Sequence, residues 1–181
     1  MIETERLVLR PLRESDVETL VVELNNFNIT RNTARIPYPY SEQDAEDYLT
    51  YKRSLNSQSL ALAISLSAAP AELIGGISYL YSTGKNDAEL GYWLSEDHWG
   101  KGLMTEATAA MVKHAFNTLH IEKLVACYHN DNPVSARILT RLGFEGNAQC
   151  SNFSLAQGKE VTVTNMHLTK ASWLAKQKGR S

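Results

Sequence analysis

Short runs in which apolar and polar positions alternate predict several β-strands along the chain. Alternation over about four to eight positions indicates a strand with one buried face. In the first of these runs, residues 2–12, Leu7 and Leu9 lie on the same face. Pro70 and Gly84 mark turns in a later group of such runs. The pattern there predicts three consecutive strands, at residues 60–67, 73–81 and 87–94.

Apolar residues about three to four positions apart predict helices in other parts of the chain. The clearest helix is predicted at residues 103–119, because apolar residues recur there on one helical face. These residues are Leu103, Ala107, Ala110, Met111, Ala115 and Leu119. A shorter helix is predicted at residues 133–142, with Pro133 at its first position and Gly143 as its stop.

Two further helices are predicted near the N-terminus from their capping residues. Ser15 and Glu18 have the spacing of a capping box, which predicts a helix that extends to about Asn25. Ser41 precedes a run of acidic residues that suits the start of a second helix, because carboxylates stabilise a helix N-terminus. The segment between these helices, which ends in the sequence IPYPY, is predicted to be a loop.

The order of these elements predicts the fold class. The strand at 87–94, the helix at 103–119 and a strand at 122–129 form a βαβ unit, whose strands are expected to be parallel. Short turns join the other strands, which are therefore expected to be antiparallel. The last two strands are predicted at residues 144–153 and 160–169, before a polar tail. The whole chain, residues 1–181, is thus expected to form one α+β (mixed α/β) domain, with ligands bound beyond the C-terminal ends of the parallel strands.

Composition and charge restrict the kinds of function. The 181 residues, of which 43% are hydrophobic and 21% charged, are typical of a globular domain. A formal net charge of -2 argues against broad nucleic-acid binding. Cys127 and Cys150 form no CxxC pair and the histidines show no zinc-binding spacing, so no metal is expected. We expect a cytoplasmic protein, since the sequence has neither a signal-peptide core nor a run of about 18 apolar residues.

The sequence HWGKGLMTEA places two glycines at the junction between a predicted strand and a predicted helix. A Walker loop is excluded because Lys101 is followed by Gly102, and a dinucleotide fingerprint because Thr105 stands where a third glycine is needed. The remaining phosphate-binding interpretation is a turn whose amides hold a pyrophosphate at the helix N-terminus, with Lys101 attracting phosphate. The alternative is that Gly100 and Gly102 form only a tight turn and that Lys101 is a solvated charge.

Several stretches of the chain resemble one protein family. WGKGLMTEA is similar to the acyl-CoA loop of the GNAT acetyltransferases, and NDNPVSARILTRLGF resembles the helix motif that follows it. TERLVLRPL and ELGYWL resemble the RimJ/RimL-like branch, whose members acetylate the N-terminal amines of proteins. The likeness extends over nearly the whole chain in order. It implies an acetyl-CoA-dependent N-acetyltransferase with a central, mostly antiparallel sheet that is flanked by helices and splays open between its two parallel strands.

The resemblance also implies which residues contact acetyl-CoA. Pantetheine is expected to lie between the splayed strands against the backbone of Trp93 and Leu94, with Asn132 and Ser135 facing the cofactor. The amides that hold the pyrophosphate are implied to belong to Gly100, Lys101, Gly102, Leu103, Met104 and Thr105. Met104 stands where the family usually has Gly or Ala. We expect its side chain to turn into the core, so that the backbone contact is kept.

The resemblance implies an acid and a base for the reaction. Leu139 stands where many members have the tyrosine that protonates the departing thiolate, whereas Ser135 matches the first-turn serine proposed as the acid in the RimL-like branch. Glu89 is implied as the general base, directly or through water. Each residue also has a purely structural interpretation. Ser135 would then face solvent, Glu89 would be an exposed strand charge, and Asn132 would be the N-cap of the helix that follows it.

The expected acceptor is a primary amine. An α-amine has a pKa of about 7.7–8.0 and a lysine one of about 10.4, so an α-amine is more easily deprotonated at such a site. Tyr38 and Tyr40 are implied to face the acceptor, because the family forms its acceptor pocket between the first two helices. We therefore expect a monomer or homodimer that acetylates a protein N-terminus, without a membrane or a stable nucleic-acid partner. A small-molecule amine acetyltransferase and a non-catalytic CoA-binding sensor module remain the alternatives.

Overall fold

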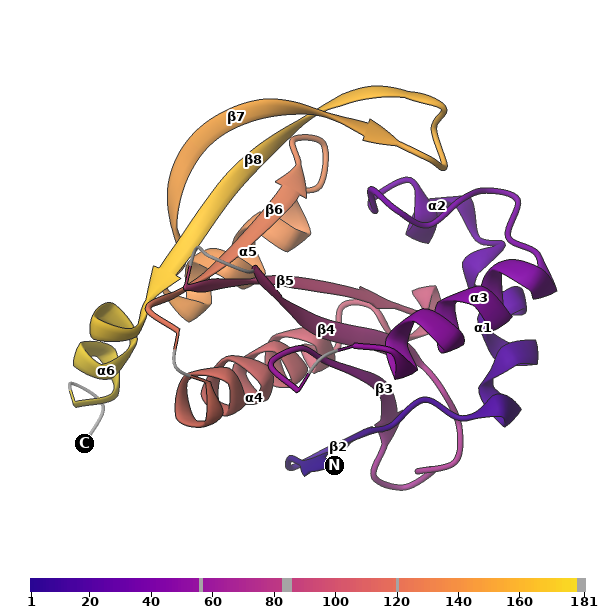
Figure 1. The fold of residues 1–181 in the computed structure, drawn as a ribbon, viewed down its shortest axis with the longest axis horizontal. Helices are drawn as coiled ribbons and strands as arrows, with labels where there is room; N and C mark the ends of the chain where they lie inside the picture. The colour runs from indigo at the N-terminus through magenta and orange to yellow at the C-terminus, as the bar shows by residue number, and fades with distance from the viewer. Residues whose placement is uncertain (56, 83–85, 120, 179–181) are drawn as a thin grey trace.

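The centre of the fold is an eight-stranded sheet with the strand order β1-β2-β3-β4-β5-β6-β8-β7 (Figure 1). The computed structural model describes residues 1–55, 57–82, 86–119 and 121–178, so the turn predicted at Gly84 lies outside the described residues. The strands are β1 (Ile2–Glu3), β2 (Leu7–Arg10), β3 (Leu60–Leu66), β4 (Gly75–Ser82), β5 (Asp87–Leu94), β6 (Lys123–His129), β7 (Glu145–Ser154) and β8 (Lys159–Thr169). Paired strands are antiparallel except β5 and β6, which are parallel as predicted.

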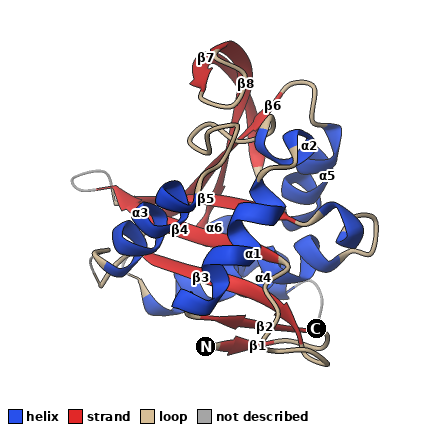
Figure 2. Cartoon of the chain, turned by 90° about the vertical axis from the view of Figure 1, so that its right-hand side faces the viewer, coloured by secondary structure: helices blue, strands red, loops and turns tan. Residues whose placement is uncertain are grey.

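Helices cover both faces of this sheet (Figure 2). The helices are α1 (Val17–Leu24), α2 (Phe27–Thr30), α3 (Glu42–Arg53), α4 (Leu103–Thr118), α5 (Pro133–Leu142) and α6 (Lys170–Lys178), with 3-10 turns η1 (Glu14–Asp16) and η2 (Glu96–His98). The neighbouring residues Leu62 and Ala63 of β3 belong to different core clusters, because successive side chains of a strand point to opposite faces. One cluster contains the apolar face of α4, and the other contains those of α1 and α3. These findings confirm the mixed α/β fold.

The predicted first strand is instead two short strands. Thr4 and Leu7 form a turn, in which the backbone N–H of Thr4 donates to the Leu7 carbonyl at 2.9 Å. The turn folds β1 back on β2 in antiparallel register, with Ile2 opposite Leu9. Leu7 and Leu9 are both fully buried, so the predicted inner face is confirmed.

The capping box predicted at Ser15 and Glu18 is wrong. Arg13 caps η1, and Asp16 Oδ2 accepts a hydrogen bond from the Arg13 backbone N–H at 2.8 Å, so that α1 begins only at Val17. The start of α3 at Ser41 is confirmed, since its Oγ accepts from the backbone N–H of Asp44 at 3.2 Å. The predicted loop between these helices contains the short helix α2.

The last part of the chain combines a confirmed prediction with a correction. The two final strands form the hairpin β7–β8, which arches away from the rest of the sheet (Figure 1). The predicted polar tail is instead the helix α6, which ends at Lys178. Its single aromatic residue, Trp173, is 9% exposed and lies with its ring centroid 5.3 Å from that of Phe116 in α4. One buried ring therefore anchors a segment that is otherwise polar.

Candidate functional site

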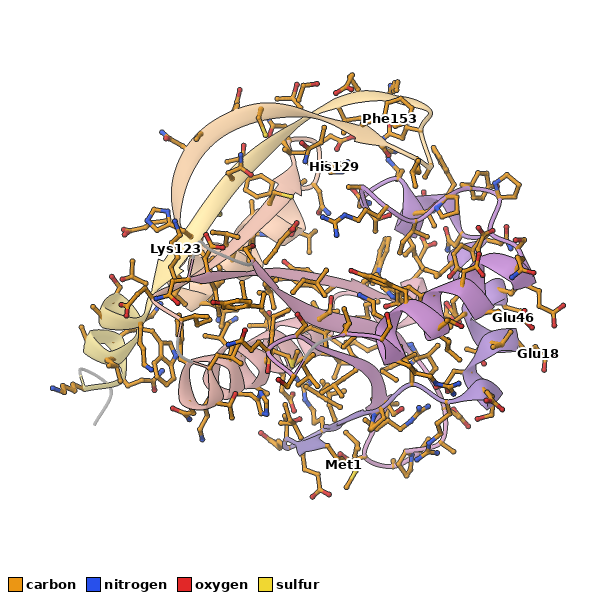
Figure 3. All side chains as sticks on the ribbon, in the orientation of Figure 1. Met1, Glu18, Glu46, Lys123, His129 and Phe153 are labelled. Carbon is orange, nitrogen blue, oxygen red and sulfur yellow. The ribbon has the colours of Figure 1, made fainter. Side chains whose placement is uncertain are left out.

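A cleft opens where the two parallel strands separate. β5 and β6 pair only from Asp87 and Lys123 to Glu89 and Val125, and beyond this point each strand pairs with its outer neighbour alone. The separation opens a cleft of about 740 Å³, which lies within the range of ligand pockets. Figure 3 labels Lys123 and His129 at the two ends of β6 and so marks the direction in which the strands diverge. The predicted splay of the sheet is confirmed.

The cleft collects most of the residues that the sequence predicted for the cofactor. Those that line it are Trp93, Leu94, Gly100, Gly102, Leu103, Met104, Thr105, Asn132 and Ser135. Trp93 and Leu94 come from the end of β5, and Asn132 and Ser135 come from the start of α5. Segments that are well separated in sequence therefore meet around one space. Beyond Glu89, the edge of β5 that faces the cleft has no β6 partner, although its other edge stays paired with β4.

The glycine turn presents the N-terminus of α4 to this cleft. Gly100 and Gly102 have φ angles of 73° and 74°, a left-handed conformation that other residues adopt at a cost. Gly102 is the N-cap of α4 and makes no side-chain cap, so the first amides of the helix are left for another acceptor. Arg6 holds the turn in place, since its Nη1 donates to the Lys101 carbonyl at 2.9 Å and its Nε to Glu106 Oε2 at 2.7 Å. The result is a fixed anion-binding turn.

The side chain of Lys101 does not line the cleft. Its Nζ donates to the backbone carbonyl of Asp97 at 2.8 Å, which directs the ammonium toward η2. Arg137 and Arg141 of α5 line the cleft instead and supply positive charge to it. Arg137 and Arg141 are four residues apart in a predicted helix, and this spacing places both on one helical face.

The side chain of Met104 packs into the core, as predicted. It is 7% exposed and belongs to the cluster beneath α4, so its bulk does not obstruct the backbone of the turn.

The carbonyl of Leu94 already accepts a hydrogen bond from Trp99 Nε1 at 2.8 Å. This bond ties the end of β5 to the residue that precedes the glycine turn.

Ser135 and Tyr92 form a polar pair on one wall of the cleft. Their hydroxyl oxygens lie 2.8 Å apart, and Ser135 is 8% exposed. Asn132 Oδ1 accepts from the Ser135 backbone N–H at 3.1 Å, which confirms the N-cap and fixes the first turn of α5. Burial raises the pKa of Tyr92 to about 12, although the hydrogen bond with Ser135 acts in the opposite direction. The phenol is therefore protonated at neutral pH and able to donate.

Tyr92 was not among the residues predicted from the sequence. Leu139, which stands where many members of the family have a tyrosine, is fully buried in the core. Tyr92 lies on β5, two strand positions from Leu90, and it reaches Ser135 only because α5 packs beside the splayed strands. The available signal was the alternation within ELGYWL, which separates Tyr92 from the face that carries Glu89.

Glu89 lies at the point where the parallel pairing ends. Its partner across the sheet is Val125, the last residue of β6 that pairs with β5. Arg35 Nη2 is 3.3 Å from Glu89 Oε2, and the two side chains are 70% and 44% exposed. An ion pair between such exposed groups is weak, so the carboxylate is easily released to another partner. Glu89 and Arg35 both line the cleft.

The structure places neither Tyr38 nor Tyr40 along the cleft. Tyr40 is 5% exposed within the core cluster of α1 and α3, and its hydroxyl donates to the Asp44 carbonyl at 3.2 Å. Tyr38 is exposed and packs on the ring of Phe27, with 5.2 Å between the ring centroids. The residues that line this end are Thr33, Ala34, Arg35 and Ile36 of the loop and Tyr48 and Lys52 of α3. These side chains, and not Tyr38 or Tyr40, are therefore the candidates for contact with the acceptor.

The tip of the β7–β8 hairpin is fastened to the loop beside the cleft. The Leu155 backbone N–H donates to the Ala34 carbonyl at 3.1 Å, and Gln157 Nε2 donates to the Arg31 carbonyl at 2.8 Å. Figure 3 labels Phe153 near the end of the arch, above the rest of the molecule. Asn152 of the hairpin also lines the cleft, so the arch bridges the cleft at the end that carries Glu89.

The described part of the chain contains no group of three or more His, Cys, Asp or Glu side chains arranged to hold a metal ion. Among the helices of the described residues, none has the length and apolar character needed to cross a lipid bilayer.

Comparison with known proteins assigns the family. A model of the acetyltransferase (GNAT) domain matches residues 6–145. The chain belongs to the GNAT family of acetyltransferases. It is accordingly an N-acetyltransferase that uses acetyl-CoA, and the anion-binding turn and splayed strands described above fit such a cosubstrate.

Three known proteins illustrate the relationship. The uncharacterized N-acetyltransferase p20 of Bacillus licheniformis is 26% identical over 172 residues, which cover 94% of this chain and 96% of that protein. The [ribosomal protein uS5]-alanine N-acetyltransferase of Escherichia coli is 34% identical over 84 residues, covering 46% and 43% of the two chains. The crystal structure of spermidine N-acetyltransferase from Vibrio cholerae, in complex with CoA and spermine, superposes with a TM-score of 0.79 at 19% identity, covering 94% and 99%.

Proposed function

We propose that the protein transfers the acetyl group of acetyl-CoA to the α-amine at the N-terminus of a protein. The observation that carries the proposal is the cleft between β5 and β6, which joins an anion-binding turn at Gly100–Thr105 to an open, polar end at Glu89. A ribosomal-protein alanine acetyltransferase among the relatives supports the choice of an N-terminal amine.

In the proposed reaction the neutral amine attacks the thioester carbonyl directly. Glu89 accepts the proton that the amine loses, directly or through water. A backbone N–H of β5 near Trp93 stabilises the oxyanion of the tetrahedral intermediate. The carbon–sulfur bond then breaks, and the thiolate receives a proton from Ser135, whose hydroxyl lies 2.8 Å from that of Tyr92. Solvent returns this proton to the Ser135–Tyr92 pair before the next turnover. No covalent acetyl-enzyme intermediate is required.

The acidity of the acceptor favours an α-amine over a lysine side chain. An α-amine has a pKa near neutrality, whereas deprotonation of a lysine at neutral pH costs about 3.5 kcal/mol more. The candidate base Glu89 is a partly exposed carboxylate, which contributes little to the deprotonation of a lysine.

The experiment is a comparison of amine acceptors with the purified chain and acetyl-CoA. The acceptors are a peptide with a free N-terminus, the same peptide with a blocked N-terminus and an internal lysine, and spermidine. We expect acetylation at the N-terminus of the first peptide, located by fragment mass spectrometry, and little product from the others. Preferred acetylation of spermidine would favour the small-molecule alternative. Release of no CoA thiol with any amine would favour the non-catalytic alternative.

A further inference from the structure

The charged side chains that line the cleft fall into two groups. Arg137 and Arg141 lie on α5, the helix that also brings Ser135 to the cleft. Arg35, Lys52 and Glu89 form the second group. Positive charges therefore outnumber negative ones along a cleft that belongs to a chain with a net charge of -2. The first group is available to the phosphates of acetyl-CoA, whereas the second contains the candidate base Glu89.

Within the described residues, Lys52 of this second group forms no ion pair. Its Nζ lies 5.1 Å from the ring centroid of Tyr48 and 5.2 Å from that of Tyr51. Among the residues that the structure describes, no carboxylate oxygen lies within 4.0 Å of this nitrogen. Burial, reinforced by the nearby charge of Arg35, lowers its pKa to about 8. A negative charge in the cleft would therefore stabilise the charged form of Lys52.

Arg35 is a second cation in the cleft that a negative charge would stabilise. Its guanidinium is shared with Glu89 over 3.3 Å, in a pair that is exposed on both sides. If Glu89 accepts a proton from the acceptor amine, as proposed above, its charge is neutralised and Arg35 loses its partner for that step. A polycationic acceptor would bring further positive charge toward both Lys52 and Arg35, which repels it.

We propose that the natural acceptor carries an anionic group beside its primary amine and that Lys52, with Arg35, binds this group. The proposal rests on the proposed function and names the substrate class of the same site. The occupant that fits best is a peptide N-terminus followed closely by an acidic side chain. A small amine that carries a carboxylate has the same chemistry, and the experiment below distinguishes the two.

The test uses three peptides that differ only at their second residue, which is Glu, Gln or Lys. For the wild type we expect kcat/KM in the order Glu, Gln, Lys, with about a tenfold preference for Glu over Gln, as a charge-assisted hydrogen bond provides. K52M should lower kcat/KM about tenfold for the Glu peptide and less than about threefold for the Gln peptide. K52E should reverse the order and favour the Lys peptide, because the charge at the site is inverted.

A neighbouring cation on the same helix provides the matched control. Arg53 pairs with the exposed Glu14 at 3.3 Å and does not line the cleft. R53M removes one positive charge from α3 and should leave the preference among the peptides unchanged. Calorimetric binding of acetyl-CoA to K52M should match the wild type, which shows that the variant is folded and its cosubstrate site intact.

The outcomes separate this inference from the proposed function. Equal kcat/KM for the three peptides, or a preference of K52M identical to that of the wild type, would overturn the role of Lys52 and leave N-terminal acetylation standing. Acetylation of none of the peptides would overturn the proposed function itself. Faster acetylation of β-alanine than of the Glu peptide would keep the anion-binding role and assign it to a small-molecule acceptor.

Discussion

The hydroxyl oxygens of Tyr92 and Ser135 lie 2.8 Å apart, joining strand β5 to the first turn of α5 at the wall of the cleft. Burial raises the pKa of Tyr92 to about 12, so this phenol keeps its proton under the conditions of catalysis. In the proposed mechanism this pair supplies the proton donor, since Leu139 of α5 is buried and carries no proton to give.

Removal of the Ser135 hydroxyl should lower kcat with little change in KM for acetyl-CoA, the pattern expected for an interaction made in the transition state. Loss of a positioned acid typically costs about 10²–10⁴-fold, so S135A should fall in that range and Y92F should show a smaller loss. Steady-state kinetics on S135A, Y92F and the double variant measure both effects. A kcat for S135A equal to that of the wild type would remove the pair from the mechanism.

Replacement of Glu89 by glutamine should lower kcat at neutral pH and restore part of it as the pH rises. The neutral amine that Glu89 would generate is then supplied by solution, since an α-amine has a pKa of about 7.7–8.0. A pH–rate profile of E89Q and wild type measures this recovery. R35M is a useful comparison, because it removes the partner of Glu89 but keeps the carboxylate. A change below about threefold at every pH would leave Glu89 as an exposed strand charge.

The preference for an acidic acceptor should decline as the pH rises through about 8. The pKa of Lys52 is lowered from 10.5 to about 8, so its positive charge is present below this value and lost above it. The charged and titratable groups that face Lys52 are Arg35, Tyr48 and Tyr51. The ratio of kcat/KM for the Glu and Gln peptides measures the effect, because deprotonation of the acceptor amine is common to both.

Arginine at position 52 separates this titration from other effects of pH. A guanidinium remains protonated throughout the accessible range, so K52R should keep its preference for the Glu peptide at pH values where the wild type has lost it. A wild-type ratio that stays constant between pH 7 and pH 9.5 would contradict the assignment of this preference to Lys52.

The buried ion pair between Arg10 and Asp16 should contribute strongly to stability. Both side chains are at most 2% exposed, and two hydrogen bonds of 2.8 Å join the guanidinium to the carboxylate. D16N leaves a buried charge without its partner and should lower the free energy of unfolding by about 3–5 kcal/mol. E14Q, which breaks the exposed pair with Arg53, should cost less than about 1 kcal/mol. Urea denaturation measures both, and equal values would contradict this account.

Much of the fold was predictable because its signals are local. The alternation in β3, β4 and β5, the apolar face of α4 and the Asn132–Pro133 start of α5 each reflect neighbours within a few residues. The glycine turn was predictable for the same reason, since a left-handed conformation at Gly100 and Gly102 leaves a direct mark on residue choice.

The remaining features depend on contacts between distant segments. Asp16 forms an ion pair with Arg10, and α1 begins only after it. Tyr40 is buried because it packs among residues of α1 and α3. Tyr92 and Ser135 are 43 residues apart, and Arg35 and Glu89 are 54 apart. The pattern within one element does not predict which distant residue a side chain contacts, so the Tyr92–Ser135 and Arg35–Glu89 pairs could not be predicted from the sequence alone.

The most direct test of the central claim is the affinity for acetyl-CoA of two matched glycine variants. Gly100 and Gly158 both have positive φ angles, 73° and 62°, and a methyl group added at either would meet no protein atom within 4 Å. G100A and G158A therefore carry a similar backbone cost, but only Gly100 lies at the turn before α4. Isothermal titration calorimetry should show acetyl-CoA binding weakened by about tenfold or more in G100A and unchanged in G158A. Equal affinity in G100A, G158A and the wild type would contradict acetyl-CoA binding at this turn.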